Sequence, residues 1–166
     1  NHPPAPTDWT GIFTNPNSTL ILNHTIIKYA SSITDKPQLV KASYAQAQAT
    51  STFPDPNKIY TAALNIGPET TTTITNSQIS DNLIGLFFQT SANNIISFSV
   101  HHNDIINNHL AGAYNPNDYG QSFDLTNNFW GHQTGPYNQQ TNPTGQSNQV
   151  LGHITFTPFL TQSALT

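Results

Sequence analysis

The sequence of 166 residues contains no cysteine, no methionine and no arginine, and it carries little charge of either sign. Without cysteine there is no disulfide framework and no thiol chemistry, so a small disulfide-stabilised scaffold is excluded. Four lysines cannot form a basic patch that neutralises phosphates, and we therefore expect no nucleic-acid partner. No apolar run approaches the ~20 residues needed to cross a bilayer, so we expect no membrane insertion.

Apolar residues are scarce as well. They make up 35% of the chain, below the about 45–50% of ordinary globular domains. Asparagine (20) and threonine (23) supply the polarity, against 8 acidic residues. A conventional core would be thin, whereas stacked repeats need few inward apolar residues because neighbouring repeats cover them. The length suits one domain over residues 1–166.

The same composition bears on location and association. A chain rich in Thr and Asn with so few charged residues is expected outside the cell or at its surface. It begins at Asn1 and not at Met, which is expected after removal of a signal segment or for part of a longer protein. Weak electrostatic self-repulsion favours association with copies of itself.

A short phrase recurs four times. Each copy has an apolar residue, a polar pair of Asn, Ser, Thr or His, and a second apolar residue five positions after the first. The copies occupy residues 22–27, 74–79, 100–105 and 125–130. The last three start 26 and 25 residues apart, and a period of this length is typical of stacked repeats.

A second apolar run precedes each phrase, and turn residues follow it. These runs lie at residues 11–14, 62–66, 85–88 and 112–114. Short β-branched or aromatic runs between turn residues predict strands. Two or three strands in each repeat, with no helical periodicity, predict an all-β fold and a parallel β-helix of about four coils.

The polar pairs are predicted to form two columns along the stack. The first column contains His24, Asn76, His102 and Asn127, and the second contains Thr25, Ser77, Asn103 and Asn128. Asn side chains at tight corners can bond to one another and tolerate left-handed backbone. We interpret the columns as a ladder that holds the turns; a ligand groove is the alternative.

Residues 31–60 form an excess segment, because Leu22 and Ile74 lie 52 residues apart, twice the repeat. The segment is interpreted as an inserted surface loop, in which residues 41–49 have the Ala and Gln content of a short helix. It holds three of the four lysines. A lateral contact or binding arm is the alternative interpretation.

The C-terminal part carries a recognisable pattern. It reads Leu125-Thr-Asn-Asn-Phe-Trp-Gly131, then Thr134-Gly-Pro-Tyr137, Asn142-Pro-Thr-Gly145 and Val150-Leu-Gly-His-Ile-Thr-Phe-Thr-Pro-Phe-Leu160. This resembles the closing segment of right-handed parallel β-helix proteins of the pectate-lyase-like superfamily, with Phe where Trp is common at 129 and 159. The resemblance covers nearly all the chain except residues 31–60. It implies a right-handed β-helix, but the superfamily includes lyases, hydrolases, adhesins and structural proteins.

Residues 131–166 are expected to cap the stack. Trp130 and Phe129 would cover the last core layer, and the segment with Phe156, Phe159 and Leu160 would fold a last strand across the end, because terminal repeats must be atypical. No comparable cap precedes the first repeat. Residues 1–6 are interpreted as a linker, or alternatively as part of an end left open for another subunit.

Catalytic residues of the enzymes that the chain resembles are mostly missing. Lyases of this kind use Arg or Lys as a base together with calcium, and Lys28 is the only lysine outside the excess segment. Hydrolases need two carboxylates. Asp104, Asp118 and Asp124 are predicted in neighbouring coils, yet no Asp-Asp pair or Asn-x-Asp triplet of the polygalacturonase kind is present. The catalytic candidates are therefore Asp104 and Asp124, and a non-enzymatic protein is favoured.

No metal or other cofactor is expected. His101 and His102 would point to opposite faces of a strand, so with His109 and Asp104 they do not make a tetrahedral ligand set. Asp118 and Asp124 with carbonyl groups leave calcium as an alternative, without a carboxylate cluster.

Aromatic residues near the C-terminal coils give the remaining candidate site. Tyr114, Tyr119 and Tyr137 could stack on sugar rings, or they could pack within the cap. The preferred prediction is a non-catalytic, secreted or cell-surface structural or adhesive module that associates with itself, for example into a filament or surface layer. The alternative is a domain that binds or degrades extracellular glycan. The threonines of residues 70–75 suggest an ice- or mineral-binding surface as a third hypothesis.

Overall fold

The computed structural model describes residues 3–4, 8–30, 33–35, 54, 58–89, 97–116 and 122–165. All regular elements in these ranges are strands, which confirms the predicted all-β class. The strands are β1 (Ile12–Phe13), β2 (Thr19–Asn23), β3 (Ile26–Lys28), β4 (Ile33–Asp35), β5 (Lys58–Tyr60), β6 (Leu64–Ile66), β7 (Thr71–Thr75), β8 (Gln78–Ser80), β9 (Ile84–Phe88), β10 (Ser97–Val100), β11 (Asp104–Ile106), β12 (Ala111–Tyr114), β13 (Phe123–Asp124), β14 (Pro136–Tyr137), β15 (Ser147–Leu151) and β16 (Ile154–Thr155).

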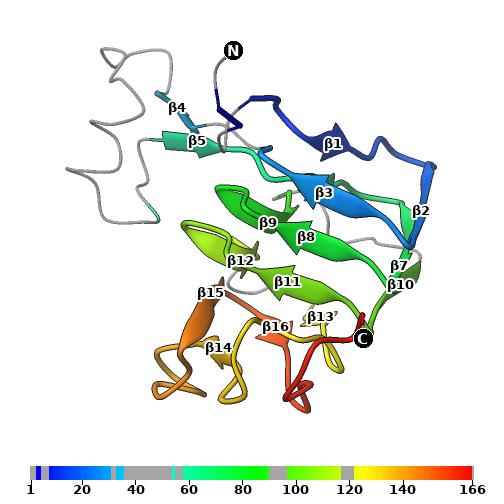
Figure 1. Cartoon of the computed structure of the whole chain (residues 1–166). Helices are drawn as coiled ribbons and strands as arrows, with labels where there is room; N and C mark the ends of the chain where they lie inside the picture. The colour runs from blue at the N-terminus through cyan, green and yellow to red at the C-terminus, as the bar shows by residue number, and fades with distance from the viewer. Residues whose placement is uncertain are drawn as a thin grey trace.

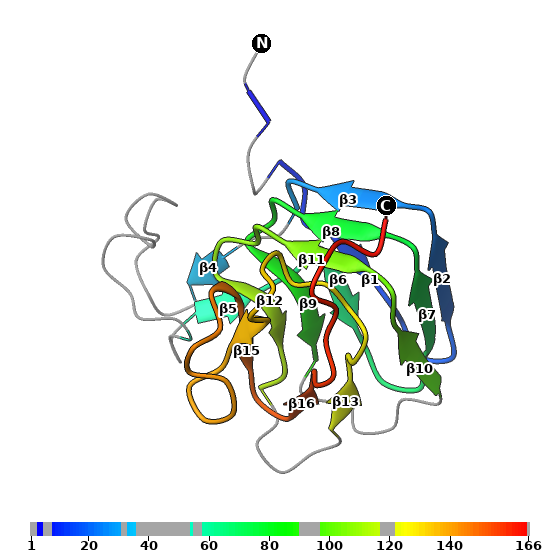
Figure 2. The ribbon, with the colours of Figure 1, turned by 60° about the horizontal axis from the view of Figure 1, so that its bottom comes forward.

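Corresponding strands of successive repeats lie side by side and run parallel (Figures 1 and 2). Repeat 1 contributes β1, β2 and β3, repeat 2 contributes β6, β7 and β8, and repeat 3 contributes β9, β10 and β11. The sheets follow the orders β1-β6-β9-β12-β15-β14, β2-β7-β10 and β3-β8-β11, and β13 pairs with β16. We call this set of superposed repeats the stack. Parallel pairing follows because the chain passes in the same direction through every repeat.

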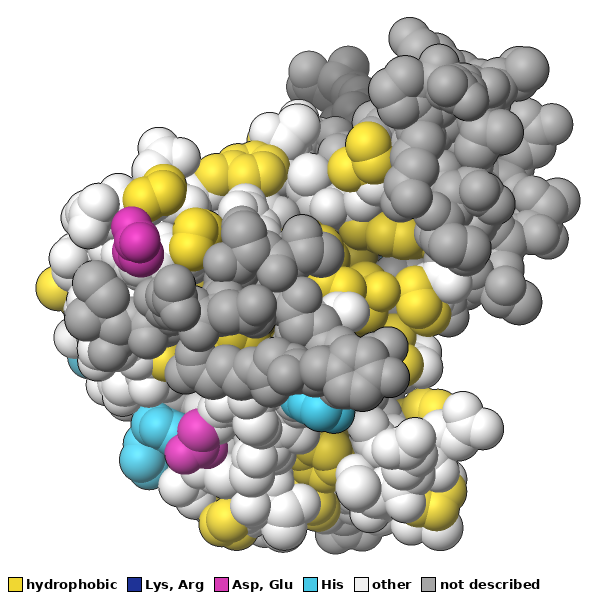
Figure 3. Space-filling view, turned by 180° about the vertical axis from the view of Figure 1, so that it is seen from behind, with side chains coloured by type: hydrophobic (Ala, Val, Ile, Leu, Met, Phe, Trp, Pro, Cys, Tyr) yellow, Lys and Arg dark blue, Asp and Glu magenta, His cyan; other side chains and the backbone are white. Residues whose placement is uncertain are grey.

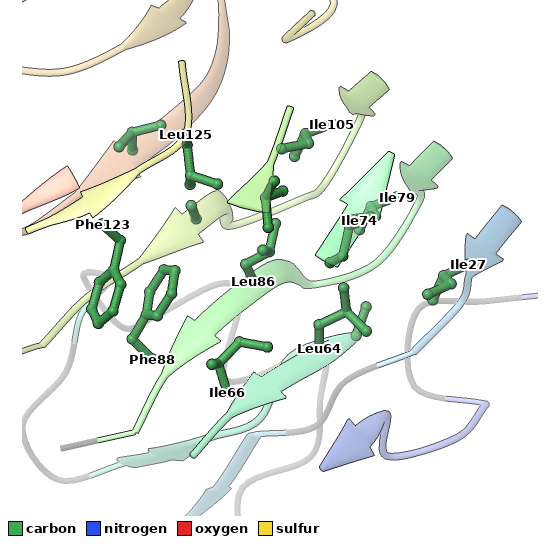
Figure 4. Close-up of a cluster of buried hydrophobic side chains, with 14 of the residues drawn as sticks. Ile27, Leu64, Ile66, Ile74, Ile79, Leu86, Phe88, Ile105, Phe123 and Leu125 are labelled. Carbon is green, nitrogen blue, oxygen red and sulfur yellow. The ribbon is translucent and has the colours of Figure 1, made fainter. Parts of the chain in front are cut away.

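The register confirms that the predicted phrases are equivalent. Leu22 and Val100 both pair with Ile74, and Ile27 and Ile105 both pair with Ile79. Side chains alternate between the two faces of a strand, so these residues all point inward. Figure 4 shows the resulting buried cluster, and Ile74, Ile79, Val100 and Ile105 are completely buried.

Aromatic side chains fill one part of this core. Phe88 stacks on Phe123 with ring centroids 3.8 Å apart, and Phe98 meets both rings edge-on. Offset and edge-on ring contacts contribute about 0.5–1.5 kcal/mol each beyond the burial of apolar area. Repeat 3 supplies Phe88 and Phe98, and the following repeat supplies Phe123, so the cluster links β9, β10 and β13.

The predicted insertion, residues 31–60, has β4 near its start and β5 at its end, and these two strands pair with each other. β4 and β5 are antiparallel, with Ile33 opposite Tyr60 and Asp35 opposite Lys58. Residues 36–53 and 55–57, which include the helix predicted at 41–49, lie outside the described residues.

The C-terminal segment continues the stack. β15 pairs in parallel with β12, β16 pairs in parallel with β13, and Leu160 bridges to Phe129. Residues 154–160 thus lie along β13 and Phe129, and the expectation that residues 131–166 cap the stack stays a prediction. Trp130 is completely buried, as expected for the last core layer, and it lies so close to Gly112 that a Cβ there would be 2.9 Å from its ring.

Candidate functional site

One corner of the stack confirms the predicted ladder. His24, Asn76, His102 and Asn127, which precede the bonding side chains, all have positive φ, between 49° and 58°. The backbone N–H of Thr25 donates to Ser77 Oγ (3.1 Å), that of Ser77 to Asn103 Oδ1 (3.0 Å) and that of Asn103 to Asn128 Oδ1 (3.0 Å). The backbone N–H of each repeat thus donates to the side chain of the next repeat along the stack. Asn103 and Asn128 are fully buried.

A second ladder, which the sequence analysis missed, occupies the next corner. The N–H of Ala30 donates to Asn82 Oδ1 (2.9 Å), that of Asn82 to Asn108 Oδ1 (3.2 Å) and that of Asn108 to Asn148 Oδ1 (3.1 Å). The residues before the first three members again have positive φ. The spacing of 26 residues between Asn82 and Asn108, equal to that of the phrases, was the available signal.

Both ladders stop at repeat 1. Ala30 has no side-chain acceptor, and the hydroxyl of Thr25 donates to the Asn23 carbonyl of its own strand (3.2 Å). At the other end of the first ladder, Asn127 N–H donates to the carbonyl of Pro158 (2.7 Å), a residue that has no N–H to pass on. Pro158 therefore interrupts this corner at the C-terminal end, whereas at repeat 1 the Thr25 hydroxyl keeps lone pairs that could accept, as Ser77 Oγ does while it donates to the Thr75 carbonyl.

Repeat 1 forms the outer edge of three sheets. Within the described part of the chain, β1, β2 and β3 each end their sheet, so their outward backbone groups face no further strand. Among the described contacts, the last residues of repeat 1 are covered: Asp8 N–H donates to the carbonyl of Tyr29, and Trp9 Nε1–H donates to that of Lys28 (2.8 Å). Unpaired edge strands are templates for pairing with another chain.

Exposed apolar side chains gather on these strands. Ile21 is 68% exposed, Ile26 66% and Phe13 46%. In the next two repeats the positions beside Ile21 carry Thr73 and Ser99. The positions beside Ile26 carry Gln78 and Asp104. At these two positions the side chain is thus large and apolar only in repeat 1. We call β1, β2 and β3 with Phe13, Ile21 and Ile26 the first-repeat edge.

Charge is nearly absent from the first-repeat edge. β1 and β2 contain no charged residue, and Lys28 of β3 lies 3.4 Å from the carboxylate of Asp81. On the side of the molecule that faces away from the viewer in Figure 1, the described surface likewise shows few acidic side chains and no Lys or Arg (Figure 3). Association through such a surface meets little like-charge repulsion.

Asp104, one of the two catalytic candidates, is engaged by the C-terminal tail. Its side chain is buried, with one carboxylate oxygen accepting from Ser163 Oγ (2.7 Å) and the other from Ala164 N–H (2.8 Å). The carboxylate holds the tail against β11. These two hydrogen bonds give the Asp104 carboxylate a structural role.

Asp124, the other candidate, is exposed on β13, in a different sheet from Asp104. Burial raises the pKa of Asp124, but hydrogen bonds from the backbone and side chain of Thr126 and the charge of His101 outweigh it, so the pKa lies below its ordinary value of 3.8. His101 Nδ1 lies 2.7 Å from the Thr126 carbonyl, so this nitrogen carries the proton. The cluster is a turn stabilised by local bonds.

The tyrosine candidates do not form one described site. Tyr114 projects from β12 beside Phe87, with ring centroids 5.6 Å apart and planes at 57°. Tyr137 is partly exposed on β14, at the far edge of the same sheet. Tyr119 and Asp118 lie outside the described residues.

The described residues provide neither a cluster of metal ligands nor a membrane-spanning helix. Within the described ranges, no group of three or more His, Asp or Glu side chains could hold a metal ion. His102 lies at the positive-φ corner and is exposed. No described helix has the length and apolar character to cross a membrane.

Comparison with known proteins gives no assignment. No family model, no curated protein and no solved structure matches this chain.

Proposed function

We propose that this chain is a non-catalytic structural or adhesive module of a secreted or cell-surface protein, built as a right-handed parallel β-helix, which associates with copies of itself through the first-repeat edge. The β-helix interpretation is supported by the parallel pairing of equivalent strands and by the two corner ladders. The extracellular location is supported by composition.

The placement of exposed apolar side chains carries the proposal. Natural proteins protect edge strands with charges, prolines or bulges. Here β2 is a five-residue edge strand with neither charge nor proline, and Ile21 and Ile26 lie open on β2 and β3. Burying one such side chain contributes about 1.5–3 kcal/mol, and edge pairing adds backbone hydrogen bonds.

Sedimentation of the purified chain over a range of concentrations tests the proposal. We expect the average mass to rise above 18.1 kDa with concentration. Ile26→Lys should weaken association by about tenfold, or ~1.4 kcal/mol. Gln78→Lys, at the neighbouring position in repeat 2, is the matched control. A single mass of one chain at every concentration would show that the proposed function is wrong.

Glycan binding is the second candidate. It is supported by the pair of Phe87 and Tyr114 on the outward face of the large sheet, because exposed aromatic rings can stack on sugars. Saturable binding of a soluble polysaccharide that is weakened by Tyr114→Ala, but not by Tyr137→Ala, would locate such a site there. Equal binding by both variants and the unchanged chain would exclude both tyrosines.

A further inference from the structure

We infer that self-association through the first-repeat edge closes at two copies, with β2 of one copy lying antiparallel to β2 of the other across a two-fold axis at Ile21. The inference rests on the proposed function, because it specifies the partner and geometry of the same surface. It differs from an open filament, in which the first-repeat edge of one copy would meet the C-terminal end of the next.

The ladders argue against that head-to-tail contact. In every interior step, a backbone N–H donates to a side chain of the following repeat. A preceding copy in the same orientation would need acceptors at positions 25 and 30. Ala30 has none, so the second ladder has no acceptor for a preceding copy. The Thr25 hydroxyl donates to Asn23 and keeps lone pairs that could accept, as Ser77 Oγ does. The second ladder is therefore the one that begins at repeat 1.

The far end of the sheets supplies no edge as open as β2: β10, which ends the sheet of β2, is four residues long and lies against β13. β14 and β16 are two residues long, and Pro136 occupies the first position of β14. The carbonyl of Pro136 accepts a hydrogen bond from the Asn142 side chain (2.8 Å). Beyond β16, Pro158 has no N–H. A heterologous contact needs two different complementary surfaces, whereas a two-fold contact uses one surface twice.

The register of the two-fold contact follows from side-chain alternation. Leu20 and Leu22 are half-buried and pack against the core, whereas Thr19, Ile21 and Asn23 point outward. Antiparallel pairing keeps these faces matched if Ile21 lies opposite its own copy and Thr19 lies opposite Asn23. The two exposed Ile21 side chains then become direct cross-strand neighbours, with Cβ atoms about 5 Å apart.

The absence of charge allows this contact to be self-complementary. In a two-fold contact a charged residue on or near the axis lies close to its own duplicate, and like charges directly opposite each other are destabilising. β2 carries no charge, and Lys28, on β3, lies beside Asp81. β2 of one copy can therefore pair with β2 of a second copy without electrostatic repulsion.

A charge-swap experiment on the full chain tests the two-fold axis. Sedimentation equilibrium should give a mass that saturates at two chains. Ile21→Lys and Ile21→Glu should each raise the dimer dissociation constant at least tenfold, because equal charges face each other. An equimolar mixture of the two variants should recover the dimer, because the introduced lysine of one chain then faces the introduced glutamate of the other.

Thr73→Lys and Thr73→Glu, at the neighbouring outward position of β7, are the matched controls and should leave the dimer unchanged. Circular dichroism and thermal unfolding verify that each variant is folded. A dimer that Ile21→Lys leaves intact, or two dissociated variants that do not recover on mixing, would overturn the two-fold pairing.

Two further outcomes separate the inference from the proposed function. Assemblies that keep growing with concentration would support self-association and overturn closure at two copies. A monomer at every concentration would overturn both.

Discussion

At the C-terminal end of the stack the last strands are two residues long and proline lies within or just beyond them, whereas at the first-repeat edge β2 extends for five residues without proline or charge. The exposure of apolar side chains also differs between the two ends. Trp130 and Phe156 are buried near the C-terminal end, but Ile21 and Ile26 are mostly exposed at the first-repeat edge.

This difference separates two ways in which a stack of parallel strands can end. The C-terminal segment completes the core and leaves little regular edge, as natural proteins do when an edge faces water. The first-repeat edge has regular strands and apolar side chains, as surfaces do that become buried in an assembly. Under the proposed function, the C-terminal end would serve stability and the first-repeat edge would serve association.

The largest expected effect comes from core truncation at the C-terminal end. Phe156→Ala should destabilise the monomer by about 3–5 kcal/mol, because it leaves a cavity beside buried neighbours. Leu20→Ala at the first-repeat edge should cost only roughly 1–2 kcal/mol, because part of that side chain is already exposed to water. Urea unfolding at concentrations where the chain is monomeric measures both. Equal losses would contradict the assignment of different roles to the two ends.

The next largest effect tests the direction of the ladder. Asn103→Ala removes the acceptor of Ser77 N–H and the donor to the Ile74 carbonyl (2.8 Å), and both groups are buried. We expect a loss of roughly 2–4 kcal/mol. Thr25→Ala, at the first member of the same ladder, removes an acceptor that no repeat uses and should cost less than about 0.5 kcal/mol. A loss of similar size for Thr25→Ala would show that its hydroxyl, besides donating to the Asn23 carbonyl, accepts a hydrogen bond from another group.

The regular part of this fold could be predicted from sequence because the signal recurs. The repeated phrase predicted that Leu22, Ile74 and Val100 occupy equivalent positions, and the polar pairs predicted the first ladder. Both predictions were possible because each repeat must place the same kind of side chain at the same corner. The second ladder was missed because it begins with Ala30 and because Asn108 and Asn148 lie 40 residues apart, separated by the C-terminal turns.

The candidate site was predicted only in outline. The expectation of an uncapped first repeat came from the sequence and stays a prediction, because residues 1–2 and 5–7 lie outside the described residues. The exposure of Ile21 and Ile26 could not be predicted, because alternating apolar residues look the same on an edge strand and an interior strand. The role of Asp104 was also hidden. Its partners Ser163 and Ala164 lie 59 and 60 residues away in a tail that belongs to no repeat.

A smaller effect is expected at Asp104, where the C-terminal tail meets the stack. Asp104→Ala removes both acceptors and should release the tail, with a global cost of about 1 kcal/mol or more, since hydrogen bonds to charged groups exceed that value. Hydrogen exchange at the Ala164 amide should become faster. Asp104→Asn keeps one carbonyl acceptor and should retain part of the protection. Unchanged exchange in Asp104→Ala would show that other contacts hold the tail.

The smallest effect is the pH dependence contributed by Asp124. Its pKa is lower in the folded chain than the ordinary 3.8 because the bonds from Thr126 and the charge of His101 outweigh burial, so the unfolded chain binds this proton more readily. The resulting stability is present above about pH 4 and is lost as the pH falls through the lowered pKa. Asp124→Asn should therefore be slightly less stable than the unchanged chain near neutral pH and equal to it in strong acid. Ser122→Ala, on the same exposed turn, should show a difference that does not vary with pH. If the Asp124→Asn difference persisted unchanged into strong acid, the local hydrogen bonds rather than the charge would account for the role of this residue at the C-terminal end.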